Sequence, residues 1–372
     1  MWYDGLWRWW QIGGNMIVVS YGADVAKSAY DALAASDVAR YLKAGDAVAI
    51  KPNLVVPCPA LTGATTHPEA VEGIILFLRD FGVSKMKIIE SSWVGGSTKR
   101  AFEECGYAAL SKKYGVPLVD LKDDSSTALR HGGLEIAVCD EALGADFLLN
   151  APVLKAHCQT RMTCCMKNLK GCIPDREKRK FHALGIHRPV AALNALLATG
   201  YCVVDGICGD LSFEEGGSPV ESDRVIAGRD PLTVDSFCAE LIGYRPDDIG
   251  YIAQGRAMGL GEPRAPGEAD TRVVEIGAHD KPLHGPRCDH AAERYAGMID
   301  EDQACSACYS SLVHALHRLG GKARVGGGKI HVGQGFRGKG GEGAGVGACA
   351  RGFSRCVAGC PPKATDIIRE FG

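Results

Sequence analysis

The chain has 372 residues, of which 46% are hydrophobic, and a formal net charge of −2 at pH 7. This length can support one large core and a smaller module. Because 42 basic residues nearly balance 44 acidic ones, the charge gives no reason to expect binding to nucleic acid or to an anionic membrane surface. Sixteen cysteines without an export signal predict a reducing compartment, the cytoplasm, where cysteines remain thiols or metal ligands.

The first fifteen residues differ from the rest in composition. They hold four of the five tryptophans but lack the cleavage site of an export signal. We interpret residues 1–15 as an extension or a mis-called start that precedes Met16. The longest uncharged stretch, Pro189–Val204, is too short and too polar to cross a bilayer, so we expect no membrane contact.

Between residues 16 and 263, short apolar runs alternate with amphipathic segments. This pattern predicts an α/β domain with a mainly parallel sheet and flanking helices. Strands are predicted at Ile17–Ser20, Ala47–Ile50, Met86–Ile89, Pro117–Val119 and Phe147–Leu149. Helices are predicted at Ala26–Ala35, Pro68–Phe81 and Ser97–Leu110, with Gly82 ending the second.

Polar residues follow two of these strands directly. Lys51 and Asn53 follow the second strand, and Ser91 and Ser92 follow the third at the start of a helix. Open α/β sheets bind ligands at the carboxyl ends of their strands, and N–H groups and hydroxyls at such a turn can hold a phosphate or carboxylate. The alternative is a Ser/Gly turn that only caps the helix.

The densest group of cationic and titratable side chains lies between residues 155 and 187. It comprises Lys155, His157, Arg161, Lys167, Lys170, Lys180, His182 and His187. A lysine buried among cations has a lowered pKa and can act as a base or nucleophile, and histidine titrates near neutrality. We expect three catalytic residues, Lys155, His157 and Lys167. We expect a small anionic substrate to be bound by Lys51, Asn53, Ser91, Ser92, Asn168, Lys170 and His182.

Four acidic residues follow this basic run, namely Asp205, Asp210, Glu214 and Glu215. Carboxylates of this kind could hold a divalent metal. We prefer the interpretation that they form ion pairs that position Lys155 or Lys167.

Several motifs in this domain occur together in one known family. They are Lys51-Pro52-Asn53, Asn150-Ala-Pro-Val-Leu-Lys155-Ala-His157, Met166-Lys167-Asn168-Leu169-Lys170-Gly171, Lys180-x-His182 and Val204-Asp205-Gly206. Over roughly residues 45–262 the chain resembles the family known as domain of unknown function 362. The resemblance implies no reaction, but members of this family often carry a C-terminal iron–sulfur module.

The composition changes after the α/β domain. Residues 264–290 are rich in proline, glycine and charge, which predicts a linker. Residues 291–372 form a cysteine-rich module in which positions 320–347 contain thirteen glycines. That content predicts a loop wrapped closely around an inorganic cofactor, because it is too high for a regular packed element.

The module carries five cysteines, Cys305, Cys308, Cys349, Cys356 and Cys360, and two prolines follow the last. Cysteines two residues apart can bind one metal centre from a single helical turn, and distant ones can close the cage. Thiolates select iron–sulfur clusters, zinc or copper. The spacing favours a 4Fe-4S cluster. Zinc is the alternative, particularly if Cys356 replaces Cys349 as a ligand.

Gly-x-Cys followed by Gly-Cys-Pro-Pro, downstream of Cys-x-x-Cys, resembles the proximal cluster loops of nickel–iron hydrogenase small subunits and of the related quinone-oxidoreductase subunit. The resemblance covers residues 305–368. It implies Cys305, Cys308, Cys349 and Cys360 as cluster ligands and leaves Cys356 as a spare thiol. The usual ferredoxin motif, with three cysteines at two-residue gaps, is absent.

Two functions of different class are compatible with these features. In the first, the chain is an iron–sulfur-dependent oxidoreductase or lyase that acts on a small carboxylate or phosphate in a basic cleft. In the second, it is an electron-transfer or partner-binding protein; a structural zinc site is a further alternative. We favour the enzyme, because an electron carrier needs little beyond its cluster fold, whereas about 250 residues here form an α/β domain. A redox partner protein and a homodimer are left open.

Overall fold

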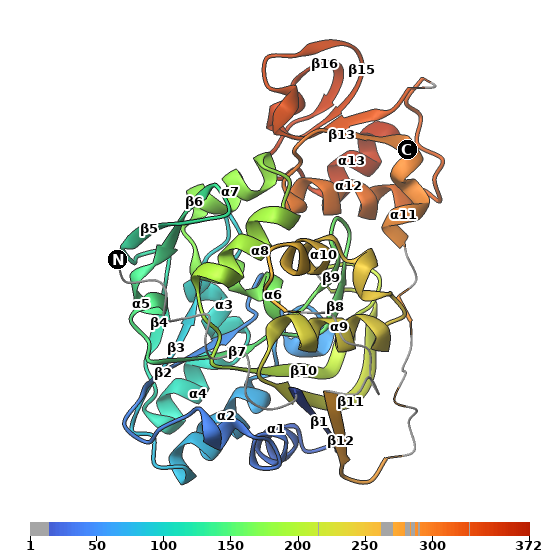
Figure 1. Ribbon diagram of the computed structural model, residues 1–372. Helices are drawn as coiled ribbons and strands as arrows, with labels where there is room; N and C mark the ends of the chain where they lie inside the picture. The colour runs from blue at the N-terminus through green and yellow to red at the C-terminus, as the bar shows by residue number, and fades with distance from the viewer. Residues whose placement is uncertain are drawn as a thin grey trace.

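The computed structural model describes residues 15–214, 216–261, 271–279, 283, 287–288, 291–326 and 328–372. Figure 1 shows a large α/β domain with the C-terminal segment folded as a smaller unit at one end of it. The predictions for the first residues, for most of the 264–290 linker and for Glu215 lie outside the described residues.

A large, mostly parallel sheet forms the centre of the α/β domain, which confirms the predicted fold class. Its strand order is β12-β1-β11-β10-β7-β2-β3-β4. Its strands are β1 (Asn15–Tyr21), β2 (Ala47–Pro52), β3 (Lys85–Glu90), β4 (Leu118–Asp120), β7 (Phe147–Ala151), β10 (Tyr201–Asp210), β11 (Pro219–Gly228) and β12 (Thr271–Ile276). β11 runs antiparallel to β1 and β10, and the other neighbours are parallel. All five predicted strands are present.

Helices cover both faces of the sheet, because successive strand residues point to opposite sides. In β1, Val18 packs on one face, whereas Ile17 and Val19 pack on the other. The first face is covered by α1 (Val25–Ala34), α2 (Pro68–Asp80), α3 (Thr98–Glu104) and α4 (Tyr107–Tyr114). The second is covered by α6 (Cys165–Asn168), α7 (Asp175–Ala183), α8 (His187–Leu196), α9 (Pro231–Leu241) and α10 (Gly250–Ala257). Among the helices described, none has the length and apolarity needed to cross a membrane.

The single helix predicted over Ser97–Leu110 is wrong, because the segment forms two helices. α3 and α4 are separated at Gly106, which has a φ of 82°. This left-handed conformation ends a helix and is available to glycine without strain.

Two hairpins and a short helix complete the domain. The hairpins pair β5 (Ser126–His131) with β6 (Leu134–Cys139), and β8 (Lys155–His157) with β9 (Arg161–Thr163). The short helix is α5 (Asp140–Leu143).

The C-terminal unit has its own small sheet and core. Its parallel strands, in spatial order, are β13 (Ile299–Glu301), β14 (Ile330–Val332), β15 (Gly340–Val346) and β16 (Gly352–Val357). Its helices are α11 (Ala291–Tyr295), α12 (Ser306–Arg318) and α13 (Ala364–Phe371). Leu312 and Leu316 of α12 are fully buried against this sheet.

The prediction that residues 320–347 form an irregular loop is wrong, because β14 and β15 lie within this segment. Here glycine serves close packing. A Cβ on Gly340 would lie 2.2 Å from the carbonyl oxygen of Gly352 on the neighbouring strand, and one on Gly335 would lie 2.0 Å from the Asp302 carboxyl carbon. Gly340 therefore lets two strands approach closely, and Gly335 lets the Asp302 side chain pack against the backbone.

Candidate functional site

A cavity of about 130 Å³ lies where the α/β domain meets the C-terminal unit. In Figure 1, α12 lies directly above the end of the α/β domain that carries α10. One side, which we call the lysine wall, comprises Lys51, Asn53, Glu90, Ser91, Ser92, Lys167, Asn168, Lys170, Lys178, His182 and Glu214. The other side, the cysteine wall, comprises Cys305, Cys308 and Cys360 with their neighbours.

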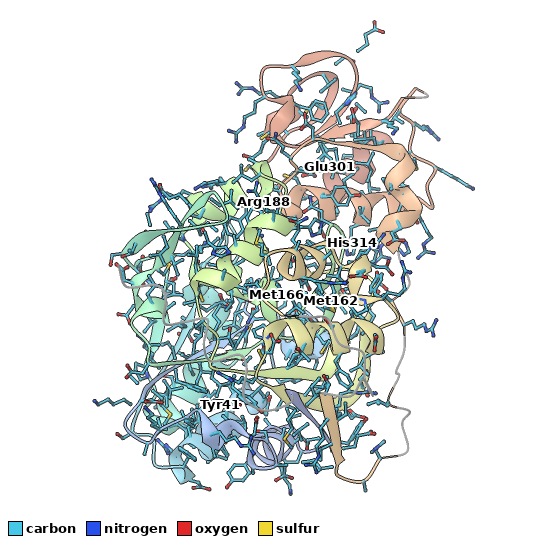
Figure 2. All side chains as sticks on the ribbon, in the orientation of Figure 1. Tyr41, Met162, Met166, Arg188, Glu301 and His314 are labelled. Carbon is cyan, nitrogen blue, oxygen red and sulfur yellow. The ribbon has the colours of Figure 1, made fainter. Side chains whose placement is uncertain are left out.

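Contacts between the two units hold the walls together. Gln159, at the tip of the β8–β9 hairpin, donates to the Ala304 carbonyl at 2.9 Å and accepts from the Ser306 hydroxyl at 2.8 Å. Phe213 belongs to the α/β domain but is buried in the core of the C-terminal unit, with its ring centroid 4.1 Å from that of His314. Figure 2 shows His314 on the side of α12 that is turned toward the α/β domain.

A buried ion pair forms the base of the lysine wall. The Lys51 ammonium donates to Glu90 Oε2 at 2.8 Å and to the Pro52 carbonyl at 2.6 Å. Glu90 also accepts the backbone N–H groups of Leu54 and Ser91. Such a pair is stable in a protein interior only when further hydrogen bonds satisfy both charges, and this one meets that condition.

Gly171 makes the close packing around this ion pair possible. A Cβ at this position would lie 2.2 Å from Glu90 Oε1 and 2.5 Å from Lys51 Nζ. The glycine of the Met-Lys-Asn-Leu-x-Gly motif is therefore required by the approach of its backbone to the ion pair.

Asn168 organises the next part of the lysine wall. Its amide nitrogen donates to the Lys51 carbonyl at 3.1 Å and to Asn150 Oδ1 at 2.8 Å, and its oxygen accepts from Asn53 Nδ2 at 3.0 Å. Asn53 Oδ1 is buried and has no hydrogen-bond partner among the described residues. The wall thus contains one unsatisfied acceptor.

The short helix α6, which carries Lys167 and Asn168, is fixed by Asp235. This buried carboxylate accepts the N–H groups of Cys165 at 2.7 Å and Met166 at 3.0 Å. Cys164, Cys165 and Asp235 are also the one group of three or more possible metal ligands in the described part of the chain whose atoms lie within 4.8 Å of one another. Because both oxygens of Asp235 are used by backbone N–H groups, we assign it to positioning α6.

Lys155 and His157 lie behind the lysine wall, so the expectation that they share one cleft with Lys167 is wrong. The Lys155 ammonium donates to the carbonyls of Ala64 at 2.6 Å and Glu214 at 2.8 Å. His157 lies 2.8 Å from Glu214 Oε2 and its Nδ1 accepts a backbone N–H. Alternate residues of a strand share a face, and in β8 this face turns away from the cavity. The catalytic roles predicted for these residues remain untested.

Glu214 is the residue that reaches the cavity in their place. Its Oε1 lies 3.2 Å from Lys167 Nζ. Burial opposes ionisation of this carboxyl, but His157 and Lys167 hold its pKa well below the ordinary value. Burial lowers the pKa of His157 to about 4. His157 is therefore neutral near pH 7, with its Nε2 beside the Glu214 carboxylate.

Three nitrogen bases remain in the lysine wall. Lys170 Nζ lies 3.2 Å from His182 Nε2. Burial lowers the pKa of Lys170 to about 7 and that of His182 well below its usual value. Lys178 donates to Ser91 Oγ at 2.5 Å and to the carbonyls of Ser91 and Ser92, and burial lowers its pKa to about 8.

Lys178 was missed by the sequence reasoning. It precedes His182 by four residues on α7, so both side chains lie on the same helical face. That periodicity was the available signal. Lys51, Asn53, Ser91, Ser92, Lys167, Asn168, Lys170 and His182, all predicted from sequence, do meet at the cavity.

The predicted metal-binding cysteines are arranged around the opposite wall. Cys305 precedes α12, Cys308 lies in its first turn, and Cys349 and Cys360 follow β15 and β16. Burial, together with negative charge on Cys305, Cys360 and Cys349, raises the pKa of Cys308 to about 12. Burial is the one cause of the raised pKa of Cys356. Negative charge on the other predicted ligands therefore raises the pKa of Cys305 and of Cys308, whereas none of these charges affects the pKa of Cys356.

Comparisons with known proteins agree with one part of the sequence reasoning. Residues 48–240 match the family model described as Domain of unknown function (DUF362). The Thylakoid-associated protein sll1697 of Synechocystis sp. is 26% identical over 231 residues, which cover 59% of this chain and 70% of that protein. The lactate racemase apoprotein from Thermoanaerobacterium thermosaccharolyticum aligns with 60% of this chain at 12% identity and a TM-score of 0.40, and the chain spans 57% of that structure.

The family match and the site coincide. Residues 48–240 contain every residue of the lysine wall, from Lys51 to Glu214, whereas the cysteine wall lies beyond them. The match also covers more than half of the chain. The chain therefore belongs to the family described as domain of unknown function DUF362.

Proposed function

We propose that this protein is an iron–sulfur enzyme, an oxidoreductase or lyase, that binds a small anionic substrate between the lysine wall and the cysteine wall. The observation that carries the proposal is the shared cavity, which is lined by Lys167, Lys170 and Lys178 on one side and by cysteines on the other. A protein that only carries electrons has no need of a lysine-lined cavity next to its metal centre.

The spacing of the cysteines supports a cluster over a single zinc ion. Tetrahedral zinc with Zn–S bonds of about 2.3 Å would bring its sulfur ligands to about 3.8 Å from one another. No three of the sulfurs of Cys305, Cys308, Cys349 and Cys360 lie within 4.8 Å of one another. A cage around four irons has to be wider, so these residues fit a 4Fe-4S cluster better.

The charges of the thiols give the same indication. Each of Cys305 and Cys308 has a raised pKa, because of burial and because of negative charge on the neighbouring cysteines. A bound cationic centre would relieve this repulsion and keep all four sulfurs ionised. When bound, a cluster at this place supplies electron exchange or an iron site that polarises a substrate oxygen.

The residues of the lysine wall would bind and orient the substrate. Lys170 and Lys178 supply positive charge, and the neutral His182 lies beside Lys170, with its Nε2 3.2 Å from Lys170 Nζ. The pKa of about 7 at Lys170 suits a group that accepts and returns a proton near neutral pH. The Lys51–Glu90 pair and Asn168 fix the base of the site.

Anaerobic purification with quantification of iron, acid-labile sulfide and zinc tests the proposal. About four irons and four sulfides per chain are expected for one cluster. Cys360→Ser should lose this content, whereas the matched variant Cys356→Ser should retain it. Stoichiometric zinc without labile sulfide would contradict the proposal.

A further inference from the structure

The lysine wall contains more lysines than carboxylates. Lys51 pairs with Glu90 at 2.8 Å, Lys167 with Glu214 at 3.2 Å, and Lys178 with Asp175 at 3.2 Å. Lys170 is the exception: no carboxylate of the described residues forms an ion pair with it, and its nearby partner is the neutral His182 at 3.2 Å. Lys170 is thus a buried cation of the cavity without an ion pair, although the charges of Glu214 and Cys305 favour its protonated form. The exposed Arg179 also lines the cavity, and no carboxylate of the described residues pairs with it.

The lysine wall also contains a hydrogen-bond acceptor that has no donor among the described residues. Asn53 is 8% exposed, and its Nδ2 is used by Asn168 Oδ1. The orientation of the Asn168 amide is fixed by its own two donations, so the free atom of Asn53 has to be the acceptor Oδ1. A buried acceptor without a donor is destabilising, and a ligand that donates a hydrogen bond to it would remove this penalty.

We infer that the ligand of this cavity is a small hydroxycarboxylate, whose carboxylate is bound by Lys170 and whose hydroxyl donates to Asn53 Oδ1. The inference rests on the proposed function, because it concerns the same cavity. Four lysines around the site disfavour an ammonium group as the donor. Burying a monocarboxylate beside Lys170 costs less desolvation free energy than burying a phosphate dianion there. The cavity volume of about 130 Å³ limits the ligand to a few carbon atoms.

Calorimetric titration of the anaerobic holoprotein with a matched ligand series tests this inference. The series is 2-hydroxybutanoate, 3-hydroxybutanoate, butanoate, 2-aminobutanoate and phosphate. At least one hydroxybutanoate should bind about tenfold more tightly than butanoate, because one hydrogen bond of about 1.4 kcal/mol is gained. 2-Aminobutanoate and phosphate should bind more weakly than that acid.

Two variants assign the effect to the named atoms. Asn53→Ala should abolish the difference in affinity between the hydroxybutanoate and butanoate, and the affinity for butanoate should stay at its wild-type value. Lys170→Met should lower the affinity for every carboxylate of the series by about tenfold or more and leave the iron content unchanged. Lys112→Met, at an exposed lysine of α4, is the matched control and should bind like the wild type.

The possible outcomes separate this inference from the proposed function. If carboxylates bind with equal affinity with and without a hydroxyl, the inference is overturned and the proposed function stands. If no anion of the series binds, both are overturned. Loss of iron from Lys170→Met would show that Lys170 supports the metal site of the cysteine wall, and this result would overturn the inference as well. If Asn53→Ala does not fold, the wild-type ligand series decides by itself.

Discussion

The two walls of the cavity differ in how their polar groups are satisfied. In the lysine wall, the Lys51 ammonium, the Glu90 carboxylate and the Asn168 amide are all paired with protein atoms. In the cysteine wall, burial raises the pKa of Cys305 and of Cys308, and negative charge on neighbouring cysteines adds to both shifts. Folding alone can therefore organise the first wall, whereas we expect the second to require a metal centre.

The largest expected effect of a single substitution is on the cysteine wall. Cys305→Ser should remove the cluster and unfold the C-terminal unit, because the remaining sulfurs cannot hold four irons. Hydrogen exchange should show lost protection in α12 and β14–β16 and retained protection in β2, β3 and β7. Cys356→Ser is the control and should leave both regions protected. Equal loss of protection in both regions would show that the lysine wall also depends on the metal.

The lysine wall should lose stability when its buried ion pair is broken, and Glu90→Ala tests this. The change leaves the Lys51 charge buried without its partner, and we expect a loss of about 3–5 kcal/mol in the free energy of unfolding. Urea denaturation measures it. The control is Glu104→Ala, which breaks the exposed Arg100–Glu104 pair and should cost less than about 1 kcal/mol. Similar losses for the two variants would show that the buried pair does not stabilise the wall.

The connection between the walls can be weakened separately. Phe213→Ala removes a ring that packs beside His314 in the core of the C-terminal unit, and should cost about 3 kcal/mol of packing free energy. The two walls should then move relative to one another, so butanoate affinity should fall while the iron content stays at its wild-type value. Titration and iron analysis of the same sample test this. Unchanged affinity would show that the cavity does not depend on this contact.

The smallest effect concerns pH. Burial lowers the pKa of Lys178 to about 8; Asp175 and Glu90 oppose this shift and Lys122 adds to it. Loss of the Lys170 proton should lower butanoate affinity as pH rises through about 7. Lys178 is charged below about pH 8 and loses its proton above it, so a second fall in affinity should follow there. The fall should be less than tenfold per pH unit. Lys178→Met should remove this part of the pH profile, and an affinity that rises with pH would contradict the assignment.

The sequence predicted much of the lysine wall because parallel strands place their carboxyl ends at one edge. Lys51 follows β2 and Ser91 follows β3, so their meeting follows from the strand order. The directions of Lys155 and His157 could not be predicted, because the β8–β9 hairpin turns them toward Glu214. The family was identified from motifs that include Gly171, whose role became visible only through its approach to the Lys51–Glu90 pair.

The C-terminal unit was predicted less completely. The cysteine spacing indicated a metal centre but not the four-stranded parallel sheet that carries it. Glycine-rich strands have no hydrophobic alternation, so sequence periodicity cannot separate them from loops. The close approach of Gly340 to Gly352 explains their composition only once the strand pairing is known.

The central claim is that an anion held by the lysine wall lies next to a cluster held by the cysteine wall. Electron–nuclear double resonance of the reduced holoprotein, titrated with 2-hydroxybutanoate labelled with ¹³C at the carboxylate, tests it directly. We predict a resolved ¹³C coupling to the cluster spin that disappears in Lys170→Met. Calorimetric binding of the same ligand with no ¹³C coupling and an unchanged cluster spectrum would contradict the account.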